Sequence, residues 1–189
     1  FGFGSKTGIQ FPGESTGLLK NHQRCRSLID RVTTAFGQGV SVSVLQLNMA
    51  LGAIGNNGVL MEPILVKEIV SPKCEIVQEY KPRPVRRVLS QDTATTMLNI
   101  METVTQQGGT AFGASPPGFT TAGKTGTAQN EIGDRNSHSW FIGFAYPAKQ
   151  GPEHALAFAF LIENGGYGGR AGAQAAHDFI QASLAAKTK

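Results

Sequence analysis

Residues 118–129 contain the two motifs of this sequence whose residue types could bind a ligand or take part in catalysis. Gly118 to Thr125 satisfies the phosphate-binding pattern G-x-x-x-x-G-K-[ST], in which backbone amides cradle phosphates and the Lys reaches their outer oxygens. That pattern requires a loop between a buried apolar strand and a helix whose N-terminus faces the anion. Residues 113–117 upstream contain two adjacent prolines, and turn formers at 133–136 interrupt any helix downstream. The flanking sequence therefore disfavours a P-loop nucleotide-binding domain, which is kept as an alternative.

The same segment contains Lys124-Thr125-Gly126-Thr127, in a stretch that is predicted to be a strand. It resembles the Lys-Thr-Gly box of penicillin-binding proteins and serine β-lactamases, the third of three boxes in that superfamily. The Lys ammonium and the Thr hydroxyl present a cation and a donor to the carboxylate of a peptide-like substrate, and the next amide can point at a developing oxyanion. Gly126 suits this position because a side chain there would stand where the substrate must lie.

A second copy of the tripeptide occurs as Lys6-Thr7-Gly8. It lies in a Gly-rich opening and is followed by residues 9–14, which lack the alternation of a strand. We interpret this copy as a helix end that passes into a turn. The chemistry is therefore assigned to the copy at Lys124.

The resemblance covers nearly the whole chain in the right order. It is to class B penicillin-binding proteins, the monofunctional transpeptidases of cell division and elongation, and it is closest to the division-type members. The segments that carry it are Gly2-Phe3-Gly4, Thr7-Gly8-Ile9, Phe11-Pro12-Gly13-Glu14 with Gly17, Phe36-Gly37-Gln38-Gly39, Leu45-Gln46-Leu47, Asn57-Gly58 and Ser139-Trp140-Phe141-Ile142-Gly143-Phe144-Ala145.

Two boxes of that superfamily have no match in the sequence. The first, S-x-x-K, carries the acylated Ser and its Lys base, and the second, S-x-N, relays protons. No Ser here is followed by Lys three positions on or by Asn two positions on; Ser5-Lys6 and Ser71-Pro72-Lys73 fail the spacing. We therefore expect residues 1–189 to be the C-terminal part of a transpeptidase domain whose first two boxes lie upstream. The isolated chain should then lack a nucleophile.

The resemblance implies acyl transfer without a metal or organic cofactor. A Ser outside this chain would attack the D-Ala-D-Ala end of a peptidoglycan stem peptide, and β-lactam antibiotics would acylate the same Ser. Lys124 would supply positive potential to the substrate carboxylate and the proton relay. Thr125, beside Gly126, would hydrogen-bond that carboxylate, and the amide of Thr127 would be half of the oxyanion hole. Tyr167, in a loop that borders the cleft, would touch the substrate.

The resemblance also implies partners and a location. The partners would be stem peptides, β-lactams, the upstream half of the same domain, and membrane proteins of cell division or elongation. The domain would lie on the periplasmic side of the inner membrane, with its anchor outside this chain. A non-catalytic β-lactam-sensing or scaffold module of the same fold is the main alternative, and the upstream sequence would discriminate between the two.

Three helices are predicted around the box. Ser43 stands three residues before Gln46 in a capping-box pattern, which starts an apolar helix that stops at residues 55–58. Ser90 is the predicted N-cap of a second helix, ended by Gly108-Gly109, with a stripe of Met97, Ile100, Met101 and Val104. The third helix is predicted at 171–186, with a stripe of Ala176, Phe179, Ile180 and Leu184.

Three strands are predicted in the last third of the chain: Thr120 to Ala128, Trp140 to Tyr146 and Ala155 to Ile162. The third strand is apolar on both faces, so both faces should be covered. Prolines in residues 59–89 indicate edge strands and connectors, and the first forty residues are predicted to be irregular. Together these elements predict an α+β fold, an antiparallel sheet covered by helices on both faces.

Composition excludes several classes. With 40% apolar and 16% charged residues the chain is not disordered, and it has no apolar run long enough to span a membrane. The one dense basic run, 81–87, is broken by prolines and lacks aromatic residues, so nucleic acid is not an expected partner. Cys25 and Cys74 could be two buried thiols or one bridge. Two further groups of candidates are scattered or lie in turns: His22, His138, His154 and His177, and Glu131, Asp134, Glu153 and Glu163.

Overall fold

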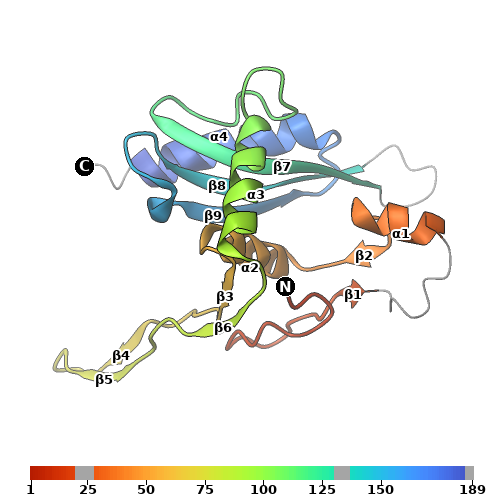
Figure 1. The fold of residues 1–189 in the computed structure, drawn as a ribbon. Coiled ribbons are helices and arrows are strands. Elements are labelled where there is room, and N and C mark those ends of the chain that lie inside the picture. The colour runs from red at the N-terminus through yellow and green to blue at the C-terminus, as the bar shows by residue number, and fades with distance from the viewer. Residues whose placement is uncertain (20–27, 130–136, 186–189) are drawn as a thin grey trace.

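The computed structural model describes residues 1–19, 28–129 and 137–185. Its main body is a three-stranded antiparallel sheet in the order β7-β8-β9, packed between helices (Figure 1). The strands are β7 (Phe119–Gln129), β8 (Ser137–Pro147) and β9 (Leu156–Ile162), and the helices are α2 (Val44–Gly55), α3 (Gln91–Thr103) and α4 (Gly168–Ala185). The predicted α+β fold is confirmed.

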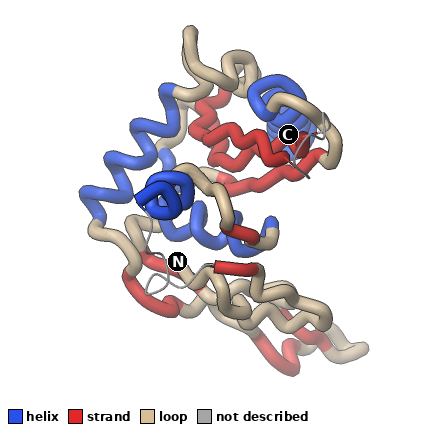
Figure 2. Tube along the Cα trace, turned by 90° about the vertical axis from the view of Figure 1, so that its right-hand side faces the viewer, coloured by secondary structure: helices blue, strands red, loops and turns tan. Residues whose placement is uncertain are grey.

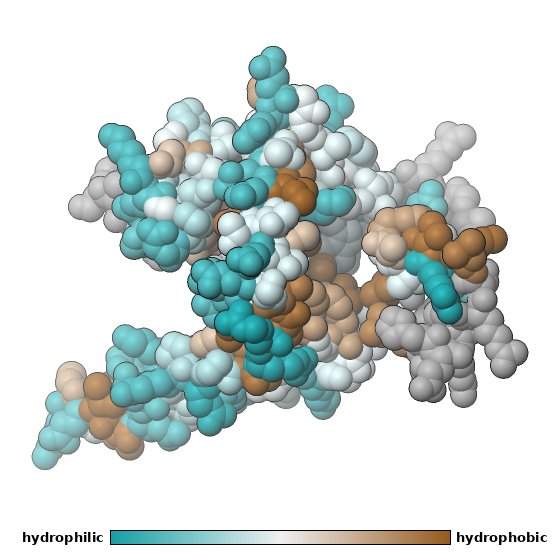
Figure 3. Space-filling model, viewed as in Figure 1, coloured by the Kyte–Doolittle hydropathy of each residue, from teal (hydrophilic) through white to brown (hydrophobic). Residues whose placement is uncertain are grey.

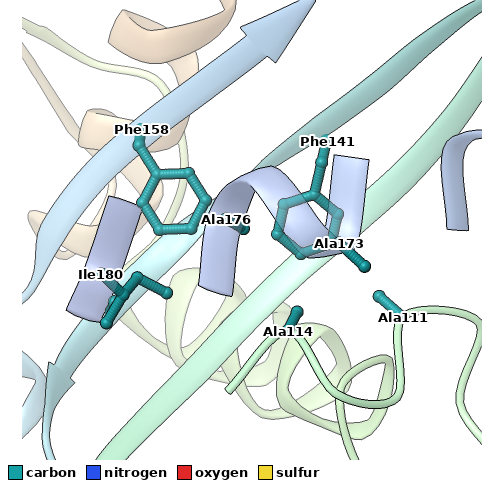
Figure 4. Packing of buried hydrophobic residues seen from close by; sticks show 8 residues of the cluster. Ala111, Ala114, Phe141, Phe158, Ala173, Ala176 and Ile180 are labelled. Carbon is teal, nitrogen blue, oxygen red and sulfur yellow. The ribbon is translucent and has the colours of Figure 1, made fainter. Parts of the chain in front are cut away.

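Helix α4 covers one face of the sheet. The rings of Phe141 from β8 and Phe158 from β9 stack with centroids 6.0 Å apart, and Ala176 and Ile180 of α4 are fully buried beside them (Figure 4). The small alanines let the helix approach closely, while the aromatic rings supply most of the apolar area removed from water. This core fixes α4 against β8 and β9.

Helices α2 and α3 cover the opposite face. Phe144 of β8 and Ala122 of β7 pack there with Leu51 of α2 and Met101 of α3. Tyr146 donates a hydrogen bond of 2.6 Å to the carboxylate of Glu102, and burial together with that carboxylate raises the pKa of Tyr146 to about 12. Both faces of the sheet are thus covered, as the apolar pattern of the third strand predicts.

Both predicted helix starts are confirmed. At α2 the Ser43 hydroxyl accepts from the Gln46 amide (3.1 Å), and the Gln46 side chain accepts from the Ser43 amide (2.9 Å), which is a complete capping box. At α3 the Ser90 hydroxyl accepts from the Thr93 amide (3.1 Å). Each cap satisfies backbone donors that have no partner inside the helix.

The predicted apolar stripe of α3 is wrong in part. Met97 and Ile100 are 38% and 56% exposed, whereas the buried side chains are Ala94, Leu98 and Met101. These three also have helical spacing, and the small Ala94 allows the closest approach to the sheet. The helix also ends at Thr103, and turns occupy the chain from there to Gly108-Gly109.

Residues 59–87 form two short hairpin-like sheets that extend away from the main body (Figure 1). Strand β3 (Val59–Met61) pairs with β6 (Pro84–Arg87), and β4 (Glu68–Val70) pairs with β5 (Ile76–Glu79). Every residue of β4 and β5 is exposed, and apolar side chains gather near the end of this arm (Figure 3). Cys74 lies in the turn between β4 and β5 and is an exposed free thiol rather than a buried one. Cys25 lies outside the described residues.

The first forty residues contain more structure than their glycines predict. They hold β1 (Leu18–Leu19), which pairs with β2 (Val40–Ser41), and helix α1 (Leu28–Ala35) between the two. Helix α1 buries none of its residues, although Leu28 and Val32 have helical spacing. The predicted irregular stretch is therefore wrong over α1. The Gln46 side chain donates to the Ser5 and Thr16 carbonyls (2.9 Å each) and so fastens this segment to α2. Loops and turns still make up most of its described residues (Figure 2).

A 3-10 turn, η2 (Pro152–His154), joins β8 to β9. In the part of the chain that the structure describes, no helix combines the length and the apolar character needed to cross a membrane.

Candidate active site

Strand β7 holds the Lys-Thr-Gly box at an open edge of the sheet. Within the described residues it pairs on one side only, with β8, in a continuous antiparallel register from Phe119↔Pro147 to Gln129↔Ser137. Within the described residues the pattern at 118–125 does not lead into a helix, because the chain is strand from Phe119 to Gln129. The backbone therefore excludes the P-loop alternative, which needs a loop and a helix N-terminus at this place.

The register decides which amides of β7 face the open edge. Gly118 and Ala148 continue the pairing, and the Ala148 amide donates to the Gly118 carbonyl (2.9 Å). In an antiparallel ladder the bonded pairs alternate with unbonded ones, so even-numbered residues of β7 bond to β8. The N–H and C=O groups of the odd-numbered residues point away from β8.

Two side-chain hydrogen bonds support this alternation. The Ser115 hydroxyl donates to the Phe119 carbonyl (2.7 Å), and the Thr105 hydroxyl donates to the Thr121 carbonyl (2.5 Å). Both acceptors are odd-numbered, as the outward direction requires. Further along, no described residue accepts from the N–H of Thr125 or Thr127. These two donors are available to a ligand that lies along the edge.

The side chains of the box alternate between the two faces of the sheet. Ala122 packs on the side of α2 and α3, so Lys124 and Gly126 share that face, and Thr125 and Thr127 lie on the side of α4. Lys124 is exposed, and its ammonium donates to the Thr125 carbonyl (2.5 Å), an odd-numbered group at the edge. The lysine charge thus lies beside the two available amides.

Thr125 is half-buried, and its hydroxyl lies 3.2 Å from the hydroxyl of Thr110. Thr110 belongs to the turn that follows α3. Nothing in the sequence around Thr110 marks it as part of the site, since its contact with the strand depends on the tertiary fold.

Gly126 has a close neighbour on its own face. A Cβ atom at this position would lie 3.1 Å from Cβ of Trp140, the cross-strand partner of Gly126. A side chain at Gly126 would therefore crowd Trp140 by a few tenths of an ångström, in addition to taking the room for substrate that the sequence predicts.

Thr127 and Tyr167 are brought together at the start of α4. The Gly168 amide donates to the Thr127 hydroxyl (3.1 Å), so Tyr167, one residue earlier, lies next to the box. Tyr167 is 60% exposed. The predicted loop that holds Tyr167 is shorter than expected, because α4 begins at Gly168 and not at residue 171. The amide of Arg170, in the first turn of α4, donates to the Tyr167 carbonyl (3.1 Å).

The other candidates lie apart from this edge. Among the described residues no three His, Cys, Asp or Glu side chains form a group that could hold a metal. Glu153 and Glu163 are exposed, as predicted for turn residues; His22, Glu131 and Asp134 lie outside the described residues. Lys6 and Thr7 line a separate hollow of about 140 Å³ beside Gln46, in irregular chain rather than at the predicted helix end.

The chain belongs to the penicillin-binding protein transpeptidase domain family, whose model matches residues 1–181. It is 39% identical over 176 residues to stage V sporulation protein D of Bacillus subtilis, covering 86% of this chain and 27% of the relative. It is 38% identical over 152 residues to the probable peptidoglycan D,D-transpeptidase PenA of Neisseria meningitidis, covering 78% and 24%. The predicted resemblance to class B penicillin-binding proteins is confirmed.

Solved structures agree with the fold. Penicillin-binding protein 3 of Mycobacterium tuberculosis, complexed with ampicillin, superposes with a TM-score of 0.82 at 29% identity, over 99% of this chain and 44% of that chain. The transpeptidase domain of Burkholderia pseudomallei penicillin-binding protein 3 has a TM-score of 0.81 at 27% identity, over 98% and 54%. The chain spans about a quarter of the length of these two curated relatives.

Proposed function

We propose that this chain supplies the Lys-Thr-Gly strand of a serine D,D-transpeptidase that cross-links peptidoglycan and is acylated by β-lactams. Membership of the transpeptidase family supports the reaction class, and the names of PenA and the ampicillin complex concern those relatives. In this proposal a Ser nucleophile comes from outside residues 1–189, because no Ser of the chain has the S-x-x-K spacing. The reaction forms an acyl-serine and releases the terminal D-Ala.

The open edge of β7 carries the proposal. A stem peptide or a β-lactam would lie antiparallel to residues 123–127 and add a short strand to the sheet, a common mode of peptide recognition. The ammonium of Lys124 and the hydroxyl of Thr125 would bind its carboxylate with charge-assisted hydrogen bonds. Tyr167, exposed at the end of the strand, would contact the substrate there.

The Thr127 amide would stabilise the oxyanion. Its N–H points outward from the strand and is held by the backbone before any ligand binds. A donor that is fixed in advance is worth more in the transition state than one that must first turn toward the charge. A second donor would come from the part of the enzyme that carries the nucleophile.

The family also suggests partners and a location for the whole enzyme. We propose that it works on the periplasmic side of the inner membrane, anchored by a segment outside this chain, with membrane proteins of cell division or elongation. The acyl acceptor would be an amine of a neighbouring stem peptide.

Labelling with a fluorescent penicillin tests the proposal. The 189-residue chain alone should not be labelled, whereas a longer product that places the S-x-x-K segment before residue 1 should form a stable covalent adduct. Stoichiometric labelling of the isolated chain would show that the nucleophile is misplaced. Labelling of the longer product without any turnover of a D-Ala-D-Ala pentapeptide would instead indicate a β-lactam sensor.

A further inference from the structure

The first turn of α4 is fastened to the strand that carries the box. Thr127 on β7 and Ser139 on β8 are cross-strand partners, so their side chains lie on the same face, toward α4. The Thr127 hydroxyl accepts from the Gly168 amide (3.1 Å), and the buried Ser139 hydroxyl accepts from the Gly172 amide (3.1 Å). Gly168 and Gly172 are one helical turn apart. The two hydroxyls thus accept hydrogen bonds from amides in two successive turns of the helix.

Gly168 lies directly on the backbone of Gly126, whose carbonyl belongs to the peptide group between Gly126 and Thr127. A Cβ atom at Gly168 would lie 2.8 Å from the carbonyl carbon of Gly126, and closer still to its oxygen. Since real Cβ atoms do not approach backbone so closely, any side chain at Gly168 would push this peptide group away. The nitrogen of the same peptide group is the Thr127 N–H that points to the open edge.

The rest of α4 gives this contact a rigid support. Ala176 and Ile180 are fully buried against Phe141 and Phe158, so the helix cannot shift without opening the core (Figure 4). Gly172 adds to the constraint, because a Cβ there would lie 2.8 Å from Cβ of Phe141. The position of the Gly126–Thr127 peptide is therefore set by the packed core through α4, and not by the strand alone.

We propose that Gly168 and the Thr127 hydroxyl are positioning residues, which orient the Thr127 N–H as an oxyanion donor. The inference rests on the proposed function for its catalytic meaning. Gly168 supports one face of the peptide group, and the hydroxyl holds Gly168 in that place. Because misplacement of a reacting group by about 1 Å can cost a factor of about 100 in rate, a small tilt of this peptide group should be measurable.

The kinetic test uses the nucleophile-containing enzyme and stopped-flow acylation by a chromogenic β-lactam. Gly168→Ala should slow the first-order acylation step about tenfold or more, with little change in the dissociation constant of the non-covalent complex, because the oxyanion forms only in the transition state. Gly52→Ala is the matched control: it makes the same change on helix α2, where a Cβ would meet nothing within 4 Å. An unchanged acylation step in a folded Gly168→Ala enzyme overturns the inference.

A second pair of variants separates the effect of losing the Thr127 hydroxyl from the effect of a less stable fold. Thr127→Val keeps the shape of the side chain but loses the acceptor, and it should slow acylation several-fold; Thr127→Ser should restore most of that loss. Equal rates for Val and Ser would overturn the role of the hydroxyl. This pair also covers the case in which Gly168→Ala does not fold.

A spectroscopic reading separates this inference from the proposed function. In the chain itself, the ¹H–¹⁵N resonance of Thr127 should shift in Gly168→Ala and stay in place in Gly52→Ala. If the enzyme is never acylated but the resonance shifts as expected, the proposed function fails while the positioning contact stands. If the enzyme is acylated and the Thr127 resonance does not move, the positioning contact is wrong.

Discussion

Residues 6–8 and residues 124–126 have the same sequence, Lys-Thr-Gly, in two very different regions of the molecule. The first copy lies in irregular chain: Gly8 has a positive φ of 84°, and the Thr7 amide is bonded to the carboxylate of Glu14 (2.7 Å). The second copy lies in an 11-residue strand with one open edge.

The difference shows what the tripeptide needs in order to act on a ligand. In the strand, alternate amides must point away from the ladder, so the box presents backbone donors beside its lysine. In the loop, the Thr7 amide already has a partner and the following Ile9 amide bonds back to the Thr7 hydroxyl (3.3 Å). A motif of three residues is therefore informative only together with the element that carries it.

The largest effect is expected from removing the outward donor. Thr127→Pro deletes the N–H and should cost at least about 2.7 kcal/mol of transition-state stabilisation, about a hundredfold in acylation rate, whereas Thr127→Ser should keep most activity. Ile9→Pro makes the same change after the first copy and should have little effect on acylation. The comparison counts only for variants that stay folded by near-UV circular dichroism. An acyl-enzyme structure with the carbonyl oxygen more than about 3.5 Å from the Thr127 nitrogen would exclude the assignment.

A smaller loss is expected from the two lysines. Lys124→Ala should slow acylation by about ten- to a hundredfold, because a charge-assisted hydrogen bond to a carboxylate is worth about 1.5 to 3 kcal/mol. Lys6→Ala should leave the rate nearly unchanged, since Lys6 is exposed in the loop. Second-order acylation rates of the nucleophile-containing enzyme measure both. Similar losses in the two variants would break the comparison.

The smallest effect is expected on the pH dependence of stability, through the contact between Glu14 and the first copy of the tripeptide, residues 6–8. Hydrogen bonds from the side chain and amide of Thr7 lower the pKa of Glu14 below its ordinary value of 4.5. The ionised carboxylate therefore stabilises the folded state above that value, and the contribution is lost as pH falls through the folded pKa. The melting temperature of Glu14→Gln should lie slightly below that of the wild type near pH 7, and the gap should narrow as the pH falls below 4.5. A gap that stays constant over this range would contradict the role of Glu14.

Local signals predicted the parts of the fold that are fixed locally. The caps at Ser43 and Ser90 are confirmed because each is a hydrogen bond between residues three apart in the chain. The stripe of α3 could not be chosen in the same way. Met101 belongs both to the predicted stripe and to the buried one, and only contact with Ala122 and Phe144 across the sheet decides between them.

In the candidate site, too, local features could be predicted and features that depend on tertiary contacts could not. Lys124, Thr125, Gly126 and Thr127 are recognisable as a motif in a strand, and Tyr167 follows from the resemblance. The contributions of Thr110 and Gly168 were missed, because both depend on neighbours that are distant in the sequence. The glycine-rich run just before the helix predicted at 171–186 was the one available signal for Gly168. The role of Gly168 could be recognised only once the structure placed it against the Gly126 carbonyl.

The alternation along β7 also limits how the length of this strand can change. A one-residue insertion or deletion between Phe119 and Lys124 would reverse the parity of every later residue relative to β8, unless a β-bulge absorbed it. The lysine would then change face and the Thr127 N–H would turn into the ladder at the same time. A two-residue change would preserve both. Evolution and protein engineering can therefore lengthen or shorten this part of the strand only in even steps without dismantling the edge.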